Sequence, residues 1–332
     1  MMNRSYLFKN YFYSGLLLMI IFLLITLMLS FMLGSENYSL QQVVQAIFHY
    51  NNNEVHNIIR EIRMPREVAA MLVGMSLACS GAVMQGITRN PLADPALIGL
   101  NAGALLFISI VFAIVPDVNF MMIMLSGFIG AIVGGTIVLM LGNSKRGGFN
   151  TMKIILAGAA VSTLMTALAQ GVSIYFKTNQ SNLLWTSGGV TGTTWQHILY
   201  AAPVILIALM LLFIFSRQLT ILSVGDEMAA GLGVDTSKTR VLFSVLTMIL
   251  AGVAVALVGS LAFVGLMVPH IARMLVGIDY RKLLPFTTIL GGIFVVWADI
   301  IARQTGESPI GAIVSIIGVP FFIYLVRKDG TM

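Results

Sequence analysis

The residues best suited to chemistry in this sequence are arginines grouped before a long apolar run. Arg60, Arg63 and Arg66 are spaced by three, so on one helical turn they would share a face, although Pro65 complicates that geometry. In the predicted topology they fall on the outer side of the membrane, against the usual inward bias of basic residues, which makes them exceptional. The simpler interpretation is that these side chains extend their charge from the membrane boundary into water.

Two ionisable residues, Asp299 and His270, lie within apolar stretches. Charged groups are costly in lipid, so ionisable residues at membrane depth are functional candidates. A proton-driven transporter would usually show more of them, and one aspartate near Arg303 or Arg273 is as easily structural. A transporter that works alone and an intramembrane enzyme using His270 and Asp299 remain open as alternatives.

Motifs for other chemistry are missing from the sequence. No lysine follows a glycine, so the phosphate-binding motif G-x-x-x-x-G-K-[ST] is absent, as are H-E-x-x-H and G-x-S-x-G. His49 and His56 have too few further ligands nearby for a metal site, so we expect ordinary surface histidines. Cys79 is the single cysteine and is expected to be a small packing residue. We therefore expect no catalytic residue, no bound metal and no cofactor.

The composition indicates an integral membrane protein. Of 332 residues, 58% are hydrophobic and 10% are charged, and the mean hydropathy is +0.94, whereas soluble domains carry about 25% charged residues. The apolar runs are continuous, which favours helices of about 20 residues over a transmembrane barrel. The net charge of +6 comes from scattered residues, so it does not indicate a nucleic-acid partner.

The apolar runs predict an all-α polytopic fold, with residues 1–332 forming a single transmembrane domain of about ten helices. The expected helices are 15–33, 66–87, 96–115, 120–141, 154–176, 198–215, 241–262, a broken or short helix around Pro269, 284–302 and 310–326. Ten spans place both termini in the cytoplasm. Of 19 lysines and arginines, only five fall outside in this topology, as the positive-inside rule requires. Those five are Arg60, Arg63, Arg66, Lys177 and Arg303.

Small residues form a stripe along the predicted helix 66–87. They recur at every fourth position, which places them on one helical face where another backbone can approach closely. The stripe consists of Ala70, Gly74, Ala78, Ala82 and Gly86. Spacing alone leaves open whether the packing partner lies in this chain or in another subunit.

The longest predicted inner loop, residues 216–240, has the pattern of a compact element. Asp226 and Glu227 favour the start of a short helix through the helix dipole, and Gly231 and Gly233 would end it. Asp235 or the two residues after it would cap the next helix. The loop is therefore expected to form a short, compact, two-helix element in the cytoplasm.

Several stretches resemble one family along residues 15–328. They are RMPREVAAMLVGMSLACSGAVMQGITRNPLADPALIGLNAGA, LWTSGGVTGTTW, GDEMAAGLGV, FVGLMVPHIARMLVG and ADIIAR. The chain is similar to the permease subunits of bacterial ABC importers for iron–siderophore complexes, haem and vitamin B12. The one small departure is Met64, at a position where leucine is common.

The resemblance implies a bacterial cytoplasmic-membrane permease that pairs with a second permease subunit, two cytoplasmic ATPase subunits and an extracytoplasmic binding protein. It implies that Arg63, Arg66 and Arg303 bind glutamates of the binding protein. It also implies a helix that couples the permease to the ATPase. The matching residues are Gly225, Asp226, Glu227, Met228, Ala229, Ala230, Gly231, Leu232 and Gly233. We expect a ferric siderophore as cargo, with haem or cobalamin as alternatives.

Overall fold

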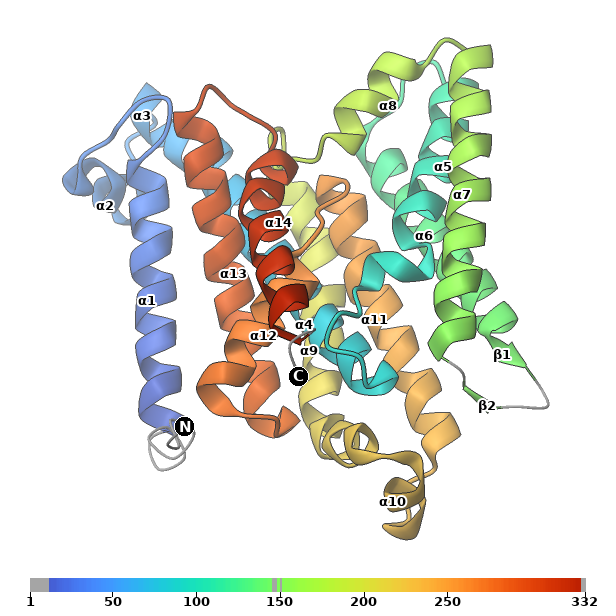
Figure 1. Cartoon of the computed structure of the whole chain (residues 1–332). Helices are drawn as coiled ribbons and strands as arrows, with labels where there is room; N and C mark the ends of the chain where they lie inside the picture. The colour runs from blue at the N-terminus through green and yellow to red at the C-terminus, as the bar shows by residue number, and fades with distance from the viewer. Residues whose placement is uncertain (1–11, 145–147, 150, 330–332) are drawn as a thin grey trace.

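The computed structural model describes residues 12–144, 148–149 and 151–329, and nearly all of them are helical (Figure 1). The helices are α1 (Phe12–Met32), α2 (Leu40–Phe48), α3 (Glu54–Asn57), the π-helical η2 (Ile58–Arg63), α4 (Met64–Thr88), the 3₁₀ turn η3 (Pro95–Ile98), α5 (Leu100–Ile114), α6 (Phe120–Gly142), α7 (Thr151–Tyr175), α8 (Asn179–Thr186), α9 (Trp195–Val224), α10 (Asp226–Gly231), α11 (Thr236–Val258), α12 (Val264–Val276), α13 (Tyr280–Gln304) and α14 (Ile310–Asp329). Strands β1 (Asn143–Ser144) and β2 (Gly148–Phe149) form a short antiparallel hairpin.

The predicted ten-helix membrane fold is confirmed. Seven described helices are long and apolar enough to cross a membrane, and three shorter apolar helices, α5, α12 and the start of α14, complete the set. At about 1.5 Å per residue, α5 and α12 each span about 20 Å, less than the hydrocarbon core of about 30 Å. The expectation of a short helix around Pro269 is met by α12.

Several boundaries differ from those that the sequence predicted. Helix α9 continues to Val224 rather than ending at 215, and α11 begins at Thr236 rather than 241, so only 225–235 separates them. Helix α8 and the β1–β2 hairpin were not predicted. His56 was expected at the surface but is buried, because its Nδ1 accepts the backbone N–H of Asn51.

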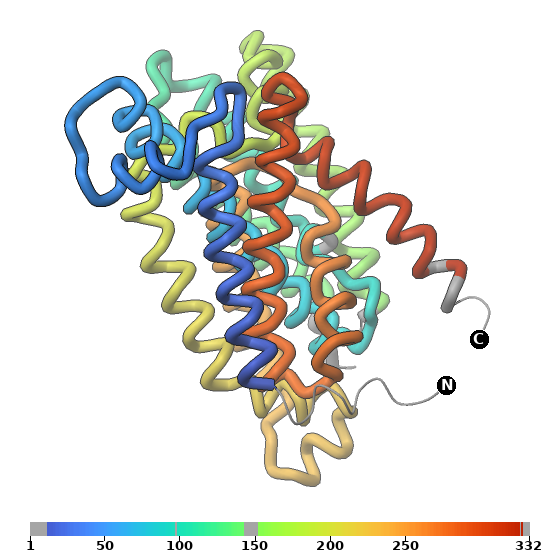
Figure 2. The backbone as a smooth tube through the Cα atoms, turned by 90° about the vertical axis from the view of Figure 1, so that its left-hand side faces the viewer, coloured from blue at the N-terminus to red at the C-terminus, as the bar shows by residue number. Residues whose placement is uncertain are grey.

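The two ends of the bundle carry different elements. Helices α2, α3 and α8 lie at one end, and α10 projects from the other (Figure 1). The ends of α1 and α14 nearest the chain termini lie toward the α10 end, and α14 leans away from its neighbour α13 (Figure 2). We refer to these ends as the α2 end and the α10 end. The arrangement agrees with an even number of crossings, and the cytoplasmic placement of the termini stays a prediction.

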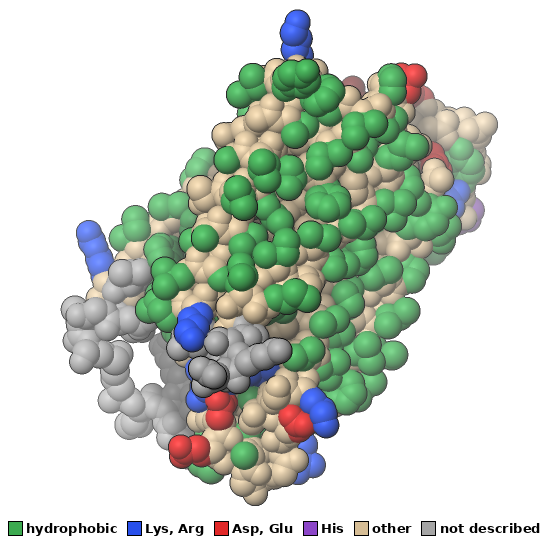
Figure 3. Space-filling view, turned by 90° about the vertical axis from the view of Figure 1, so that its right-hand side faces the viewer, with side chains coloured by type: hydrophobic (Ala, Val, Ile, Leu, Met, Phe, Trp, Pro, Cys, Tyr) green, Lys and Arg blue, Asp and Glu red, His purple; other side chains and the backbone are tan. Residues whose placement is uncertain are grey.

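The outer surface of the bundle is apolar between its ends. On the side that carries α7, the middle of the face shows hydrophobic and uncharged side chains, while Lys, Arg, Asp and Glu gather toward the ends (Figure 3). On the opposite side, α1 exposes leucine, isoleucine and phenylalanine side chains along its length. The absence of charged side chains from this band is expected of a bundle that lies in a membrane, where charged groups are costly, whether a given face meets lipid or another subunit.

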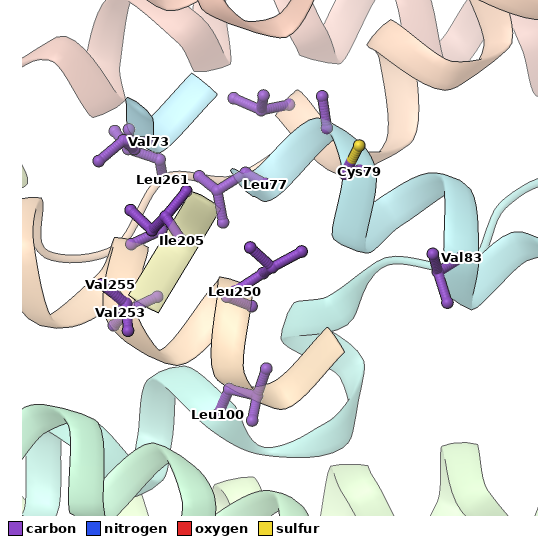
Figure 4. Packing of buried hydrophobic residues seen from close by; sticks show 14 of the residues in the cluster. Val73, Leu77, Cys79, Val83, Leu100, Ile205, Leu250, Val253, Val255 and Leu261 are labelled. Atoms are coloured by element: carbon purple, nitrogen blue, oxygen red, sulfur yellow. The ribbon is translucent and has the colours of Figure 1, made fainter. Parts of the chain in front are cut away.

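Helix α4 forms the centre of the fold. It packs against α13, α11, α12 and α9, and nearly all of its residues are buried. Leu77 of α4 lies beside Leu250 of α11, with Leu100 of α5 on the other side of Leu250, and Val83 belongs to the same apolar core farther along α4 (Figure 4). Small residues allow this density, because a Cβ on Gly81 would overlap the backbone of Gly265 on α12.

Candidate functional site

The predicted arginines lie together at the α2 end, on elements that the sequence separates widely. Arg66 stands in the first turn of α4, beside Pro65, at the junction where the π-helical η2 runs directly into α4. Nε and Nη2 of its guanidinium group donate hydrogen bonds of 2.9 to 3.1 Å to the carboxylate oxygens of Asp299 on α13. Its Nη1 lies 2.9 Å from Oε2 of Glu307, in the loop between α13 and α14.

The other two arginines face the same cluster. Arg303 shares the Asp299 carboxylate through Nε at 3.0 Å and forms an ion pair with the fully buried Glu67. Arg63 donates from Nη1 to the carbonyl oxygens of Phe31 and Met32 at the end of α1, and its guanidinium stacks over the ring of Tyr38 at 4.3 Å. These contacts satisfy the last carbonyls of α1, which have no partner within the helix.

The geometry changes the interpretation of these arginines. Arg63, Arg66 and Arg303 are all buried, and each is paired within this chain, rather than presented freely on the surface. Arg60 does not share their surroundings, because it stacks over Tyr50 at 4.8 Å. Binding-protein docking by the three predicted residues therefore remains a prediction, and only Arg66 reaches a half-exposed partner.

The ionisable residues at membrane depth have structural contacts. Asp299 is fully buried between Arg66 and Arg303, which supports the structural interpretation. His270 of α12 packs edge-on against Phe321 of α14, with ring centroids 5.8 Å apart. Cys79 is buried against Thr288, as a packing residue should be. Among the residues that the structure describes, no three His, Cys, Asp or Glu side chains converge on a metal position.

A hollow opens beside Arg66 at the α2 end. Its volume is about 470 Å³, and Arg66 and Glu307 line it together with Trp185 of α8 and Ser187, the residue after that helix. Phe120 of α6 and Leu257 of α11 form part of its apolar wall. The Arg66–Glu307 pair is therefore reachable from outside the bundle, whereas Asp299 behind it is not.

The small-residue stripe has its partner within the same chain. A Cβ on Gly74 would overlap the carbonyl oxygen of Gly291 on α13, and one on Gly86 would meet the Tyr280 hydroxyl oxygen at 2.7 Å. Tyr280 donates its O–H to the carbonyl oxygen of Ala82 at 3.2 Å. Ala70, Ala78 and Ala82 are fully buried. Gly74, Ala82 and Gly86 of the stripe therefore pack against α13 of the same chain.

The short helix predicted in the inner loop exists as α10, and Asp226 and Glu227 occupy its first turn as expected. Asp226 fastens the helix to the bundle: Oδ1 lies 3.1 Å from Nη2 of Arg89, after α4, and 2.5 Å from Nη2 of Arg240 on α11. Val234 donates its N–H to the carbonyl oxygen of Ala229 at 2.9 Å, which closes the turn. Two distant helices thus hold one short projection.

The ends of α10 depend on glycine. Gly225 and Gly233 have φ of +152° and +78°, where residues with a Cβ are rarely found. Asp235 then caps α11 by accepting the N–H of Lys238, as predicted, and this bond holds the pKa of the Asp235 carboxyl below its ordinary value. The connection is therefore fixed at both ends rather than a flexible linker.

One face of α10 is apolar and open. Ala229 is buried against the bundle, while Met228 is 58% exposed and Leu232, the residue after α10 and one turn beyond Met228, is 65% exposed. Next to it lies a groove of about 420 Å³, with Met140 of α6 and Val245 of α11 among its lining residues. An exposed apolar pair on a stiff projection suits a complementary protein surface.

Sequence reasoning missed residues that complete both sites. At the α2 end these are Glu67 and Glu307, and at the α10 end they are Arg89 and Arg240. A usable signal was present for Glu67, since a carboxylate directly follows Arg66 at the start of an apolar run. Such a charge needs a buried partner.

Comparisons with known proteins agree along nearly the whole chain. The family model of the FecCD transport family matches residues 22–328. The iron(3+)-hydroxamate import system permease protein FhuB of Bacillus subtilis (strain 168) is 42% identical over 305 residues, covering 91% of this chain and 79% of FhuB. The hemin transport system permease protein HmuU of Yersinia pestis is 37% identical over 324 residues, covering 94% and 96% of the two chains.

A solved structure has the same fold. A metal-chelate type ABC transporter in an inward-facing conformation aligns with a TM-score of 0.81 and 29% sequence identity. The alignment covers 96% of this chain and 99% of that chain, so it includes both ends of the bundle. The arrangement of helices around α4 is thus shared with a transporter.

Proposed function

Because the chain belongs to the FecCD transport family, we propose that it carries an iron(III)–siderophore complex across the bacterial cytoplasmic membrane by alternating access. Members of this family are membrane permease subunits of ABC importers, and a separate ATPase subunit hydrolyses ATP. The chain is therefore a multi-pass membrane protein and not an enzyme. Haem or cobalamin is the alternative cargo, since relatives named for both are similar to it.

The observation that supports transport driven by a separate ATPase is the way α10 is attached to the bundle. Asp226 joins it to Arg89 and Arg240, so a push on α10 reaches α4 and α11 without a flexible joint. Met228 and Leu232 face outward from it. We assign the α10 end to the cytoplasm, with residues 225–233 seated in the ATPase subunit and the apolar pair as the main contact.

The α2 end is assigned to the binding protein. Arg63 holds the end of α1 through the Phe31 carbonyl oxygen, and Arg303 holds the end of α13 through its ion pair with Glu67 of α4. Arg66 lines the hollow and can meet a partner's carboxylate. The arginines thus divide into two that shape the docking surface and one that contacts the docked protein.

In the proposed cycle, each end responds to one partner. The loaded binding protein docks at the α2 end, and ATP binding and hydrolysis in the ATPase subunits move α10. Because α10 is fastened to α4 and α11, its motion shifts the helices that line the passage in this subunit and in the second permease. The cargo then passes inward, with no chemical step performed by this chain.

A charge placed on α10 tests the coupling assignment. We expect Leu232→Asp to reduce co-purification of the ATPase subunits by about tenfold or more, because it buries an unpaired carboxylate at an apolar contact. Ser237→Asp is the matched control, since it adds the same charge at an exposed position at the start of α11. Equal retention of the ATPase by both variants would refute the assignment.

The cargo is tested through the binding protein that docks on the purified complex. Its ligand spectrum is measured with a ferric hydroxamate, ferric citrate, haem and cobalamin. We expect a ferric siderophore to bind and to be taken up by proteoliposomes only when ATP and the ATPase subunits are present. Uptake without any ATPase would overturn the proposed function.

A further inference from the structure

We propose that Glu307 is an internal latch, which occupies the donor of Arg66 that a docking carboxylate needs and leaves it when the binding protein docks. This inference rests on the proposed function, because it concerns how the docking surface is regulated. It goes further by assigning a role to a residue that neither the sequence pattern nor the family resemblance singled out.

Most of the hydrogen-bond donors of Arg66 are already occupied within the chain. Nε and Nη2 are both taken by Asp299, which is fully buried and held from the other side by Arg303. That half of the guanidinium therefore cannot turn toward a partner. Nη1 is the remaining nitrogen of the guanidinium group, and Oε2 of Glu307 lies 2.9 Å from it; both residues line the hollow.

The two carboxylates that bind Arg66, those of Asp299 and Glu307, differ in their exposure to solvent. The Asp299 side chain is 0% exposed, whereas that of Glu307 is 44% exposed. Water and salt screen the exposed pair and hardly reach the buried one. An incoming carboxylate can thus replace Glu307 while Asp299 keeps Arg66 in position.

Glu307 lies in a tight turn with an unusual backbone conformation. Its φ is +58°, and that of Gly306 before it is +80°, so two consecutive residues adopt the left-handed conformation. Residues with a Cβ rarely do so unless surrounding contacts hold them. The turn is tight, because Ser308 donates its N–H to the carbonyl oxygen of Ala302 at 3.0 Å. Release of the Glu307 side chain therefore removes one of the contacts that maintain this turn.

The turn that contains Glu307 leads directly into α14. Glu307 lies three residues before α14 begins at Ile310, and α14 leans out of the bundle with much of its surface exposed (Figure 2). The Arg66–Glu307 pair ties the start of this helix to the start of α4. Exchange of Glu307 for a partner's carboxylate would free the start of α14 while the α4–α13 packing stays intact. Docking at the α2 end would thereby reach a helix that extends toward the α10 end.

The test uses the complete transporter in lipid nanodiscs, with the binding protein that co-purifies with it. We expect Glu307→Gln to lower the Kd of the binding protein by about threefold to tenfold, because apparent affinity scales with the fraction of Arg66 that is free. The matched control is Glu61→Gln, which removes a negative charge from an exposed residue of η2 before α4. An unchanged or weaker affinity of Glu307→Gln, relative to the wild type, would overturn the latch.

A second measurement needs no binding protein. Hydrogen–deuterium exchange is compared for residues 304–314 in the wild type and in both variants. We expect faster exchange in Glu307→Gln, because the turn and the start of α14 lose their tie to Arg66, and wild-type exchange in Glu61→Gln. Wild-type exchange in Glu307→Gln would contradict the latch even if docking occurs. If no binding protein docks on the wild type, the proposed function itself fails.

Discussion

At the scale of single residues, the α2 end is organised by charges that neutralise one another inside the fold. Asp299 accepts hydrogen bonds from Arg66 and forms an ion pair with Arg303, and Glu67 provides the second buried carboxylate for Arg303. Each of these charges would be expensive in an apolar core, and together they become tolerable. The ion pairs Arg66–Asp299 and Glu67–Arg303 both join α4 to α13, so they fix the relative position of these two helices.

Removing the shared carboxylate should be severe. We expect Asp299→Asn to destabilise the protein by about 3–5 kcal/mol, because it leaves two buried guanidinium groups without their common anion. The apparent midpoint of thermal unfolding in detergent measures the effect. Asp279→Asn is the matched control: its pair with Arg281 is exposed, and asparagine caps a helix as well as aspartate does. Similar midpoints for both variants would contradict a supporting role for Asp299.

The residue scale also shows what local pattern could and could not predict. Arg303 and Asp299 are one helical turn apart, so their pairing was foreseeable from spacing. Arg66 and Asp299 are 233 positions apart, and no local pattern connects them. The arginines were found as a set, but their burial was not, since burial depends on how α1, α4 and α13 meet. The resemblance assigned all three arginines to docking. It could not show that only Arg66 contacts a half-exposed partner, whereas Arg63 and Arg303 are held by buried groups.

At the scale of elements, close approach of helix backbones carries the packing. Gly74 and Gly291 face each other so closely that a Cβ on either would overlap the carbonyl oxygen of the other. Gly103 and Gly130 do the same between α5 and α6. In lipid, such contacts replace the hydrophobic effect as the main source of association between helices. The positions of glycine thus decide which helices touch.

One added methyl group distinguishes a packing glycine from a free one. We expect Gly74→Ala to cost about 1–3 kcal/mol, because α4 and α13 must separate to admit the new Cβ. Gly171→Ala on α7 meets no atom within 4 Å, and should be neutral or stabilising by up to about 1 kcal/mol through helix propensity. Thermal unfolding midpoints in detergent compare the two. A loss in Gly171→Ala equal to that in Gly74→Ala would refute the backbone-contact argument.

Predictions of elements succeeded where hydropathy alone determines them. Each apolar run became a helix, and Gly231 and Gly233 marked the end of α10 as expected. The end of α9 was missed because Arg217 and the polar residues after it suggested a loop, while the helix continues beyond the apolar run to Val224. Helix α8 was missed because its residues show no apolar period and its position depends on contacts with α5 and α7.

At the scale of the whole molecule, two helices at opposite sides are exposed in different ways. In their most apolar windows, α1 and α7 are each only 28% buried, far less than the 78% of α11. The exposed residues of α1 include Leu17, Leu24 and Ile25. The exposed surface of α7 instead mixes apolar side chains with Thr163, Gln170 and Gly171. A glutamine facing hydrocarbon would be unfavourable, so this face of α7 needs a partner or a water-filled passage.

This contrast predicts where the second permease subunit lies. A photo-activatable benzophenone side chain replaces Gln170 in one sample and Leu17 in another, in the purified transporter complex in nanodiscs. If the polar face of α7 meets the second subunit and the apolar face of α1 meets lipid, an adduct of permease size forms from position 170 and no protein adduct forms from position 17. The comparison holds whether the second permease is identical or different. An adduct from position 17 together with none from position 170 would place the subunit contact on the α1 side, and the polar residues of α7 would then require another explanation.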